Sequence, residues 1–320
     1  MATTLTSQTV KSLARSLGFQ ACGLAQAAPV AAAVATAYRQ WIARGGHAEM
    51  DYLARNVDKR LDPTLLMPGA RTMVCVALGY SPARRIAKGE YQLAAYAYGH
   101  DYHEVMKDKL HQLAGRLCLG SGVTVRTFCD TAPVLERYWA VQAGLGWTGR
   151  NHQLIVPGAG SQFFLGELLT AAQADHYDKP VANRCGNCHA CTDACEALQQ
   201  EARTPATFFN SADCLSYQTI ERRGELTASA RSRIGSCIYG CDRCQSVCPW
   251  NRFARPTAEP LLQPSEALLA MTREDWHRLS ADDYRRLFKG SAVKRAKYEG
   301  LVRNIQAARA CTASTAPGKD

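Results

Sequence analysis

The order of apolar and polar residues predicts both helices and strands in the first half of the chain. RTMVCVALGY at 71–80 is a continuous apolar run containing β-branched residues, which predicts a buried strand. Residues 101–117 repeat apolar side chains at helical spacing, and VTVRTFC at 123–129 alternates as a strand does. A second helix is expected over 132–146, with a proline near its start and Gly144 near its end.

A hairpin is predicted after these elements. HQLIV at 152–156 and QFFLGELL at 162–169 are expected to be its two strands, and PGAGS between them has the composition of a turn. Helices and strands do not alternate regularly enough for a doubly wound parallel sheet. The pattern therefore predicts an α+β fold.

Composition divides the chain into three parts. It changes around residues 173–184, where a cysteine-rich segment begins, and after residue 255 the pattern is helical. We therefore expect an α+β domain at 1–178, a cysteine-rich module at 179–255 and a helical segment at 256–320. The tail STAPGKD is expected to be disordered.

The bulk properties exclude some classes of protein. With 47% hydrophobic and 21% charged residues, the 320-residue chain has an ordinary globular composition. No run reaches the roughly 18–20 apolar residues of a membrane span, and no secretory signal is evident. We therefore expect a monomer in a reducing, cytoplasmic compartment, with no membrane partner. The net charge of +10 fits either a basic solvated surface or a polyanionic partner.

Cysteine spacing carries the strongest chemical signal. CGNCHACTDAC has the C-x2-C-x2-C-x3-C spacing of bacterial ferredoxins, in which the fourth cysteine ligates the other of two clusters. CDRCQSVCP supplies a partner motif. Exchanging the fourth cysteines predicts one 4Fe–4S cluster on Cys185, Cys188, Cys191 and Cys248, and a second on Cys195, Cys241, Cys244 and one more cysteine.

Spacing leaves the eighth ligand open. A standard ferredoxin has it three residues before Cys241, but Ile238 stands there, so either Cys237 or Cys214 must serve. A zinc ribbon also uses paired C-x2-C motifs, but zinc needs only four ligands and leaves the doubled spacing unexplained. Structural or reactive thiols are a third possibility. Four isolated cysteines in apolar surroundings are expected in the core: Cys22, Cys75, Cys118 and Cys129.

Two adjacent one-electron centres are suited to delivering two electrons to an acceptor, and the α+β domain should hold that acceptor. The domain has no P-loop or G-x-G-x-x-G fingerprint after a strand, so a nucleotide cofactor is not indicated. A chain with both clusters but no chemistry of its own would instead be an electron-transfer protein. A zinc-stabilised nucleic-acid-binding protein is the corresponding alternative for the zinc interpretation.

Several long motifs resemble one known family. CDTAPVLERYWAVQAGLGWTGRN, FFLGELL, CLSYQTIERRGEL, IYGCDRCQSVCPWN and FKGSAVKRAKYEGLVRN are similar to segments of epoxyqueuosine reductase, and the likeness extends over residues 56–304. The resemblance implies a cobalamin-binding α+β domain related to reductive dehalogenases, a ferredoxin-like module with two 4Fe–4S clusters, and a helical C-terminal segment. The resemblance is to the short form of the family, which lacks C-terminal helical repeats.

The resemblance also implies an activity. Members of the family reduce epoxyqueuosine to queuosine at the wobble position of tRNA, the last step of queuosine biosynthesis. They use cobalamin, which receives electrons from an external donor through the clusters. The partners expected are therefore tRNA and an electron donor. The alternative is another corrinoid iron–sulfur reductase, acting on a small halogenated or epoxide molecule.

Asp130 matches the proton donor of the family. Burial beside the aromatic residues of ERYWA would raise the pKa of its carboxyl and keep a proton available near neutral pH. Asp130 could instead cap a helix that begins at Ala132. Asp101, His103 and Arg137 match polar positions of the substrate pocket, although surface charges at helical spacing would look the same.

The remaining site residues follow from the same resemblance. Positions that match the cobalamin site are Arg60, Asp130, His152, Leu154, Ser161, Ser216, Tyr217, Cys241 and Asp242. His152 stands where the family usually has threonine, and we expect it to form hydrogen bonds rather than ligate cobalt. Arg222 and Arg223 are expected to contact tRNA, together with candidates in one C-terminal helix, Lys294, Arg295, Lys297 and Arg303. The family pattern makes Cys214 the eighth cluster ligand and leaves Cys237 spare.

Overall fold

The main sheet has four antiparallel strands. The computed structural model describes residues 4–117, 124–203 and 208–314. The strand order is β2 (Ala21–Gln26), β3 (Thr72–Gly79), β8 (Phe163–Thr170) and β5 (Val125–Phe128). β3 lies inside the sheet and is buried along its whole length, as its continuous apolar run predicts. Antiparallel strands with helices packed on them confirm the α+β class.

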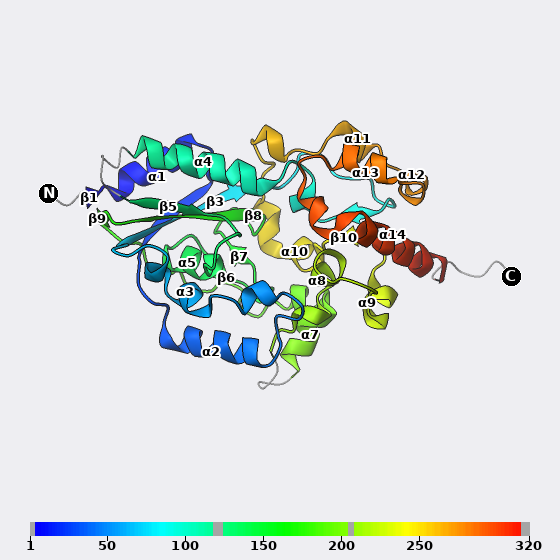
Figure 1. The fold of residues 1–320 in the computed structure, drawn as a ribbon, viewed down its shortest axis with the longest axis horizontal. Coiled ribbons are helices and arrows are strands. Elements are labelled where there is room, and N and C mark those ends of the chain that lie inside the picture. The colour runs from blue at the N-terminus through cyan, green and yellow to red at the C-terminus, as the bar shows by residue number, and fades with distance from the viewer. Residues whose placement is uncertain (1–3, 118–123, 204–207, 315–320) are drawn as a thin grey trace.

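Helices cover both faces of this sheet (Figure 1). On one face lie α1 (Ser7–Ser16) and α4 (Tyr102–Arg116), and on the other lie α2 (Ala32–Ala43), α3 (Val57–Leu61) and α5 (Glu136–Gln142). Alternate residues of β3 belong to the two cores, because side chains of a strand point to opposite faces in turn. Val74 and Val76 pack on the α1 and α4 side, whereas Met73 and Cys75 pack on the α5 side.

Gly166 of β8 sets how closely α4 approaches the sheet. A Cβ atom at this position would lie 2.6 Å from the Met106 Cε and 3.0 Å from the Leu110 Cδ1. Both side chains are buried on α4. The absence of a side chain at Gly166 therefore allows α4 to pack directly on β8, and this packing fixes the N-terminus of α4 beside the end of β5.

The predicted hairpin is wrong. β7 (Leu154–Ile155) pairs with the preceding strand β6 (Trp147–Thr148), and an isolated bridge joins Val156 to Gly160. β8 instead lies between β3 and β5. The apolar β8 buries far more surface inside the sheet than it would beside a two-residue strand, and this gain depends on strands that are distant in sequence.

The helix expected over 132–146 is also shorter than predicted. α5 spans Glu136–Gln142, and Leu135 precedes it without a side-chain cap. Gly144 follows the helix with φ 72°, as its position predicts. Because the helix does not begin at Ala132, Asp130 is not its cap, and that interpretation of Asp130 is wrong.

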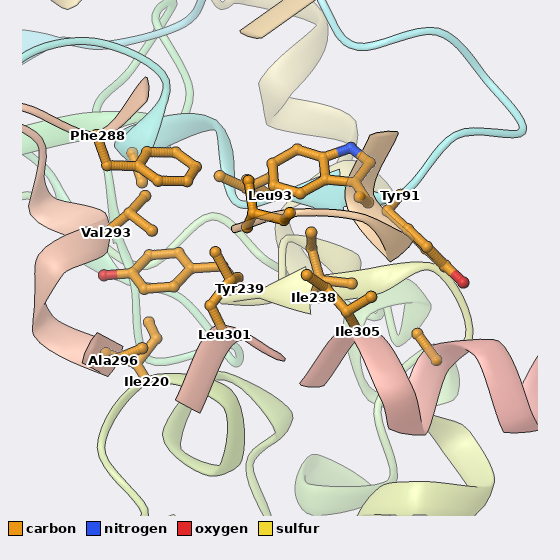
Figure 2. Packing of buried hydrophobic residues seen from close by; sticks show 14 of the residues in the cluster. Tyr91, Leu93, Ile220, Ile238, Tyr239, Phe288, Val293, Ala296, Leu301 and Ile305 are labelled. Atoms are coloured by element: carbon orange, nitrogen blue, oxygen red, sulfur yellow. The ribbon is translucent and has the colours of Figure 1, made fainter. Parts of the chain in front are cut away.

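A second core joins the segment around Tyr91 to the C-terminal part of the chain. β4 (Gln92–Leu93) pairs in parallel with β10 (Cys237–Tyr239), and α8 (Leu215–Ile220), α9 (Ala228–Arg233) and α14 (Lys297–Ser314) pack around this pair. Figure 2 shows Leu93 and Tyr239 packed with Leu301 of α14. This core crosses the expected boundary at residue 178, and the three-part division of the chain stays a prediction.

The other elements are short. The helical character expected of the C-terminal segment is confirmed as far as residue 314. Its helices before α14 are α11 (Glu266–Leu269), α12 (Arg273–His277) and α13 (Ala281–Leu287). The cysteine-rich part contains α6 (Ala190–Asp193), α7 (Glu196–Ala202) and α10 (Arg243–Ser246), and β1 (Thr4–Leu5) pairs with β9 (Gln173–Ala174).

Among the described residues, no helix combines the length and apolar character needed to cross a membrane. Cys75 and Cys129 are buried and Cys22 is half-buried, as expected of core cysteines. Cys118 and residues 315–320 of the tail lie outside the described residues.

Candidate active site and cluster sites

Asp130 lies two residues beyond β5, with φ 56°. Its Oδ2 accepts a hydrogen bond from the Tyr102 hydroxyl, and its N–H donates to the Glu136 carboxylate. A non-glycine residue in the left-handed region is held there by its surroundings and often marks a functional position. The Asp130 side chain is 61% exposed, so the burial expected for it is not observed, because the loop presents it outward from the end of the sheet.

His103 connects Asp130 to Asp101. Asp101 caps α4 by accepting the N–H of His103, and its Oδ1 lies 2.7 Å from the His103 Nδ1. The His103 Nε2 lies 3.8 Å from the Asp130 Oδ2. Burial lowers the pKa of His103, but the hydrogen bond and charge of Asp101 outweigh it, so the pKa is raised overall. The structure therefore brings Asp101, His103 and Asp130 together, with Tyr102 added.

Two glutamates that the sequence interpretation did not single out lie behind Asp130. Glu167 in β8 is fully buried, and neither of its carboxylate oxygens has a hydrogen-bond partner among the described residues. Burial raises the pKa of Glu136 to about 8 and the pKa of Glu167 well above its ordinary value, and the neighbouring charges of Asp130 and Glu136 add to this. The available signal was the single carboxylate within the apolar run FFLGELL.

The cluster cysteines form two sets in space. Burial raises the pKa of the Cys191 thiol, and the adjacent Cys248 and Cys185 thiols raise it further. Burial likewise raises the pKa of Cys248, and the Cys185 and Cys188 thiols add to this increase. These four side chains line one pocket of about 300 Å³. The first set is therefore Cys185, Cys188, Cys191 and Cys248.

The second set contains Cys214. Burial raises the pKa of Cys214, and the nearby Cys241 and Cys195 thiols raise it further. Burial also raises the pKa of Cys244, and the Cys195, Cys241 and Cys214 thiols raise it further. The second set is therefore Cys195, Cys214, Cys241 and Cys244. In the described part of the chain, no three His, Cys, Asp or Glu side chains converge as closely as a single ion such as zinc requires.

Cys237 lies beside Cys241 of the second set. Its thiol interacts with Cys241, and this hydrogen bond lowers its pKa to about 7, with a further contribution from the Arg243 guanidinium that opposes the effect of burial. The thiols that most affect the pKa values of Cys214 and Cys244 belong to the second set. The assignment of Cys214 as the eighth cluster ligand, with Cys237 spare, stays a prediction.

Arg60 carries a buried donor without an acceptor. The side chain is 8% exposed, its Nη2 donates to the Tyr52 carbonyl at 3.2 Å, and its Nε has no partner among the described residues. A buried guanidinium N–H normally has an acceptor, so this atom is suited to an amide or phosphate oxygen of a bound group. The donor set around Arg60 thus fits the cobalamin that the sequence interpretation expects.

The other expected cofactor residues of the α+β domain lie near β7. His152 has φ 58°, and its Nε2 lies 2.7 Å from the Glu201 carboxylate, as expected of a hydrogen-bonding residue. Leu154 is buried in β7. The Ser161 hydroxyl donates to the Gln245 side chain at 3.0 Å, which ties this loop to α10.

The expected cofactor residues of the C-terminal part lie in α8 and after β10. Ser216 is half-buried, and the buried Tyr217 accepts the Glu49 N–H through its hydroxyl oxygen at 3.3 Å. Cys241 belongs to the second thiol set. The Asp242 Oδ2 accepts the Ala95 N–H at 2.7 Å, which connects the cysteine-rich part to the segment that precedes α4.

The arginines that are expected to contact tRNA are held by ion pairs and hydrogen bonds within the protein. The Arg295 guanidinium pairs with the Glu221 carboxylate at 2.7 Å, and Arg222 lies 3.4 Å from the Glu49 carboxylate. Arg303 donates to backbone carbonyls of the segment that contains Arg222.

Lys294 and Arg295 are in the 3-10 helix Ala292–Ala296, whereas Lys297 begins α14 with φ 60°. The expected single basic helix is therefore wrong, because the chain turns at Lys297. Arg223 donates to the Arg295 carbonyl at 3.0 Å, and Arg137 donates to the His152 carbonyl.

Comparison with known proteins identifies the family. An epoxyqueuosine reductase from Cellulophaga algicola is 40% identical over 300 residues, which cover 93% of this chain and 96% of that protein. One from Leadbetterella byssophila is 42% identical over 300 residues, with 93% and 97% covered. The chain belongs to the epoxyqueuosine reductase family.

Family models and a solved structure agree with membership in the epoxyqueuosine reductase family. Residues 60–131 match the model described as epoxyqueuosine reductase QueG, DUF1730, and residues 184–251 match a 4Fe-4S double cluster binding domain. The crystal structure of an epoxyqueuosine reductase with an epoxyqueuosine-modified tRNA-Tyr stem loop aligns with a TM-score of 0.84 at 25% identity, covering 95% of this chain and 80% of that one. This chain is therefore an oxidoreductase with a double 4Fe–4S domain.

Proposed function

We propose that this protein reduces epoxyqueuosine to queuosine at the wobble position of tRNA, with cobalamin and two 4Fe–4S clusters. The observation that carries the proposal is the group formed by Asp130, Tyr102 and His103, in a chain whose cysteines form two sets of four. Removing the epoxide oxygen as water and leaving an alkene consumes two electrons and two protons. The two thiol sets hold the clusters that deliver the electrons, and the Asp130 group delivers the protons.

Asp130 is the proposed proton donor to the epoxide oxygen. The Tyr102 hydroxyl orients its carboxylate, and Glu136 holds its backbone by accepting the N–H. His103 lies within 3.8 Å of the carboxylate and has a raised pKa, so it can return a proton to Asp130 after each transfer. Asp101 keeps the His103 ring in position through its Nδ1.

Arg60 is the residue best suited to hold cobalamin, because its buried Nε has no acceptor in the part of the chain that the structure describes. When bound, cobalamin would supply a low-valent cobalt centre as the reductant of the epoxide. His152, Leu154 and Ser161 are proposed to border the cofactor on the β7 side. On the α8 and β10 side the proposed neighbours are Ser216, Tyr217, Cys241 and Asp242.

The proposed tRNA contacts combine backbone and base recognition. Arg222 and Arg223 are suited to phosphates, although Glu49 offsets part of their charge. The modified base must leave the anticodon stack to reach Asp130, where Asp101, His103 and Arg137 are proposed to read it. Support comes from the related reductase whose structure holds an epoxyqueuosine-modified stem loop.

Nucleoside mass spectrometry of tRNA tests the proposal. Anaerobic holoenzyme with a chemical reductant should convert epoxyqueuosine in isolated tRNA to queuosine. Asp130→Asn should bind the same tRNA with unchanged affinity but turn over roughly 10²–10⁴-fold more slowly, because it cannot supply the proton. Turnover of a small halogenated or epoxide molecule with unchanged tRNA would support the corrinoid reductase alternative instead.

A further inference from the structure

The pocket of the first thiol set opens onto a basic surface. Three arginines line it together with the four cysteines, and none of the described lining residues carries a carboxylate. All three arginine side chains are exposed. We call Arg150, Arg184 and Arg252 the arginine rim.

The arginine rim keeps its charge. Among the described residues, many other arginines pair with a carboxylate, as Arg84 and Arg278 do, but no rim arginine forms an ion pair. Arg150 donates to the Gly186 carbonyl at 2.8 Å, and the Arg252 guanidinium lies 4.6 Å from the Phe253 ring centroid. Neither contact neutralises a cation, so the rim presents net positive charge to solvent.

Apolar groups accompany these charges. Phe253 is 39% exposed and is one of the few large hydrophobic side chains on the described surface. Its ring lies 6.0 Å from that of Trp250, which makes an edge contact with Trp147 at 4.9 Å. The Trp147 Nε1 donates to the Cys185 sulfur at 3.5 Å. An exposed aromatic group surrounded by cations, in contact with a cluster ligand, has the composition of a protein docking surface.

The second thiol set is connected to the active site by a series of contacts. Cys241 packs against the second core, and the adjacent Asp242 binds the backbone of Ala95. Tyr96 follows Ala95, and its ring makes an edge contact with Tyr102, the residue that binds Asp130. Because α6, which carries Cys191, packs on α10, which carries Cys244, electrons that enter at the first set can continue through the second.

We propose that the arginine rim docks a small acidic one-electron carrier protein, which reduces the first cluster directly. The proposal rests on the proposed function and names the class of its electron donor. In each encounter the carrier loses one electron and the cluster gains one, without proton transfer, and two encounters supply one turnover. Carboxylates of the carrier match the rim, and an apolar edge around its redox centre matches Phe253.

The test measures cluster reduction in the holoenzyme without tRNA, by stopped-flow absorbance, with two reductants. One is a reduced plant-type 2Fe–2S ferredoxin, which is an acidic protein, and the other is dithionite. The variant carries Arg184→Glu and Arg252→Glu. The matched control carries Arg15→Glu and Arg116→Glu, which reverse the same number of exposed charges on α1 and α4.

With ferredoxin, we expect the second-order rate of the rim variant to fall roughly tenfold or more at low salt and to lose most of its ionic-strength dependence. The control should match the unmodified protein, and dithionite should reduce all three equally. An unchanged rate with ferredoxin would overturn the proposal. An equal loss with both reductants would also overturn it, because the arginines would then support the cluster itself.

A loss of tRNA affinity with unchanged ferredoxin rates would assign the rim to tRNA and overturn docking as well. The proposed function fails in a different way. If ferredoxin reduces the clusters through the rim but epoxyqueuosine in tRNA stays unchanged, the docking surface stands and the substrate assignment is refuted.

Discussion

Replacing Cys214 or Cys237 by serine separates the two candidate ligands of the second cluster. Cys214 lies next to the Cys241, Cys195 and Cys244 thiols, and the backbone N–H groups of Ser216 and Tyr217 stabilise its charged form. Of this set, Cys241 has the largest effect on the pKa of Cys237. Loss of Cys214 should therefore open the second cluster, whereas loss of Cys237 should leave all eight ligands in place.

The expected loss of iron follows from the two sets of four thiols. Two 4Fe–4S clusters give about eight irons per chain, so Cys214→Ser should retain about four, and Cys237→Ser about eight. Iron and acid-labile sulfide are measured on anaerobically purified protein, together with the visible absorbance, which should fall by about half in the first variant only.

The opposite pattern would refute the assignment. If Cys237→Ser loses about four irons while Cys214→Ser retains about eight, Cys237 is the ligand and the neighbours seen around Cys214 do not identify a cluster site. Cys129→Ser is a control for the loss of a buried thiol that belongs to neither set. It should retain all of the iron.

Three further predictions concern protons, stability and tRNA. Asp101→Asn should lower the pKa of His103, because Asp101 raises it in the unmodified protein. The alkaline limb of the profile of turnover rate against pH should therefore move to lower pH. If this limb does not move, His103 is not part of the proton path. Glu167→Gln should raise the free energy of unfolding increasingly as pH rises above about 4.5, by up to about 1.4 kcal/mol per pH unit. The reason is that Glu167 retains its proton in the folded wild type but releases it in the unfolded chain. Unfolding temperatures at pH 5 and pH 8 check this, and an equal difference at both would contradict it. Arg222→Ala with Arg223→Ala should weaken tRNA binding and reduce its logarithmic salt slope by about two, whereas a change in affinity with the slope unaltered would indicate a structural role.

Local patterns predicted the elements that depend on neighbouring residues. The burial of β3, the helix after Asp101 and the strand before Asp130 all follow from apolar periodicity. Cysteine spacing likewise predicted the first thiol set, because two residues between thiols is a local constraint on a short turn. The family resemblance, carried by the motif that contains Cys214, supplied the remaining member of the second set.

Tertiary structure alone decided the features that depend on distant segments. β8 pairs with β3 and β5 and not with β7, because insertion between two longer strands buries more apolar surface than pairing with the two-residue β7 would. The same insertion places Glu167 inside the sheet behind Asp130, and α4 brings Tyr102 to the Asp130 carboxylate. No periodicity marks such contacts, since they arise only when the end of β5, the start of α4 and the middle of β8 meet. The sequence determined which residues could do the chemistry, and the packing of the sheet decided which of them meet.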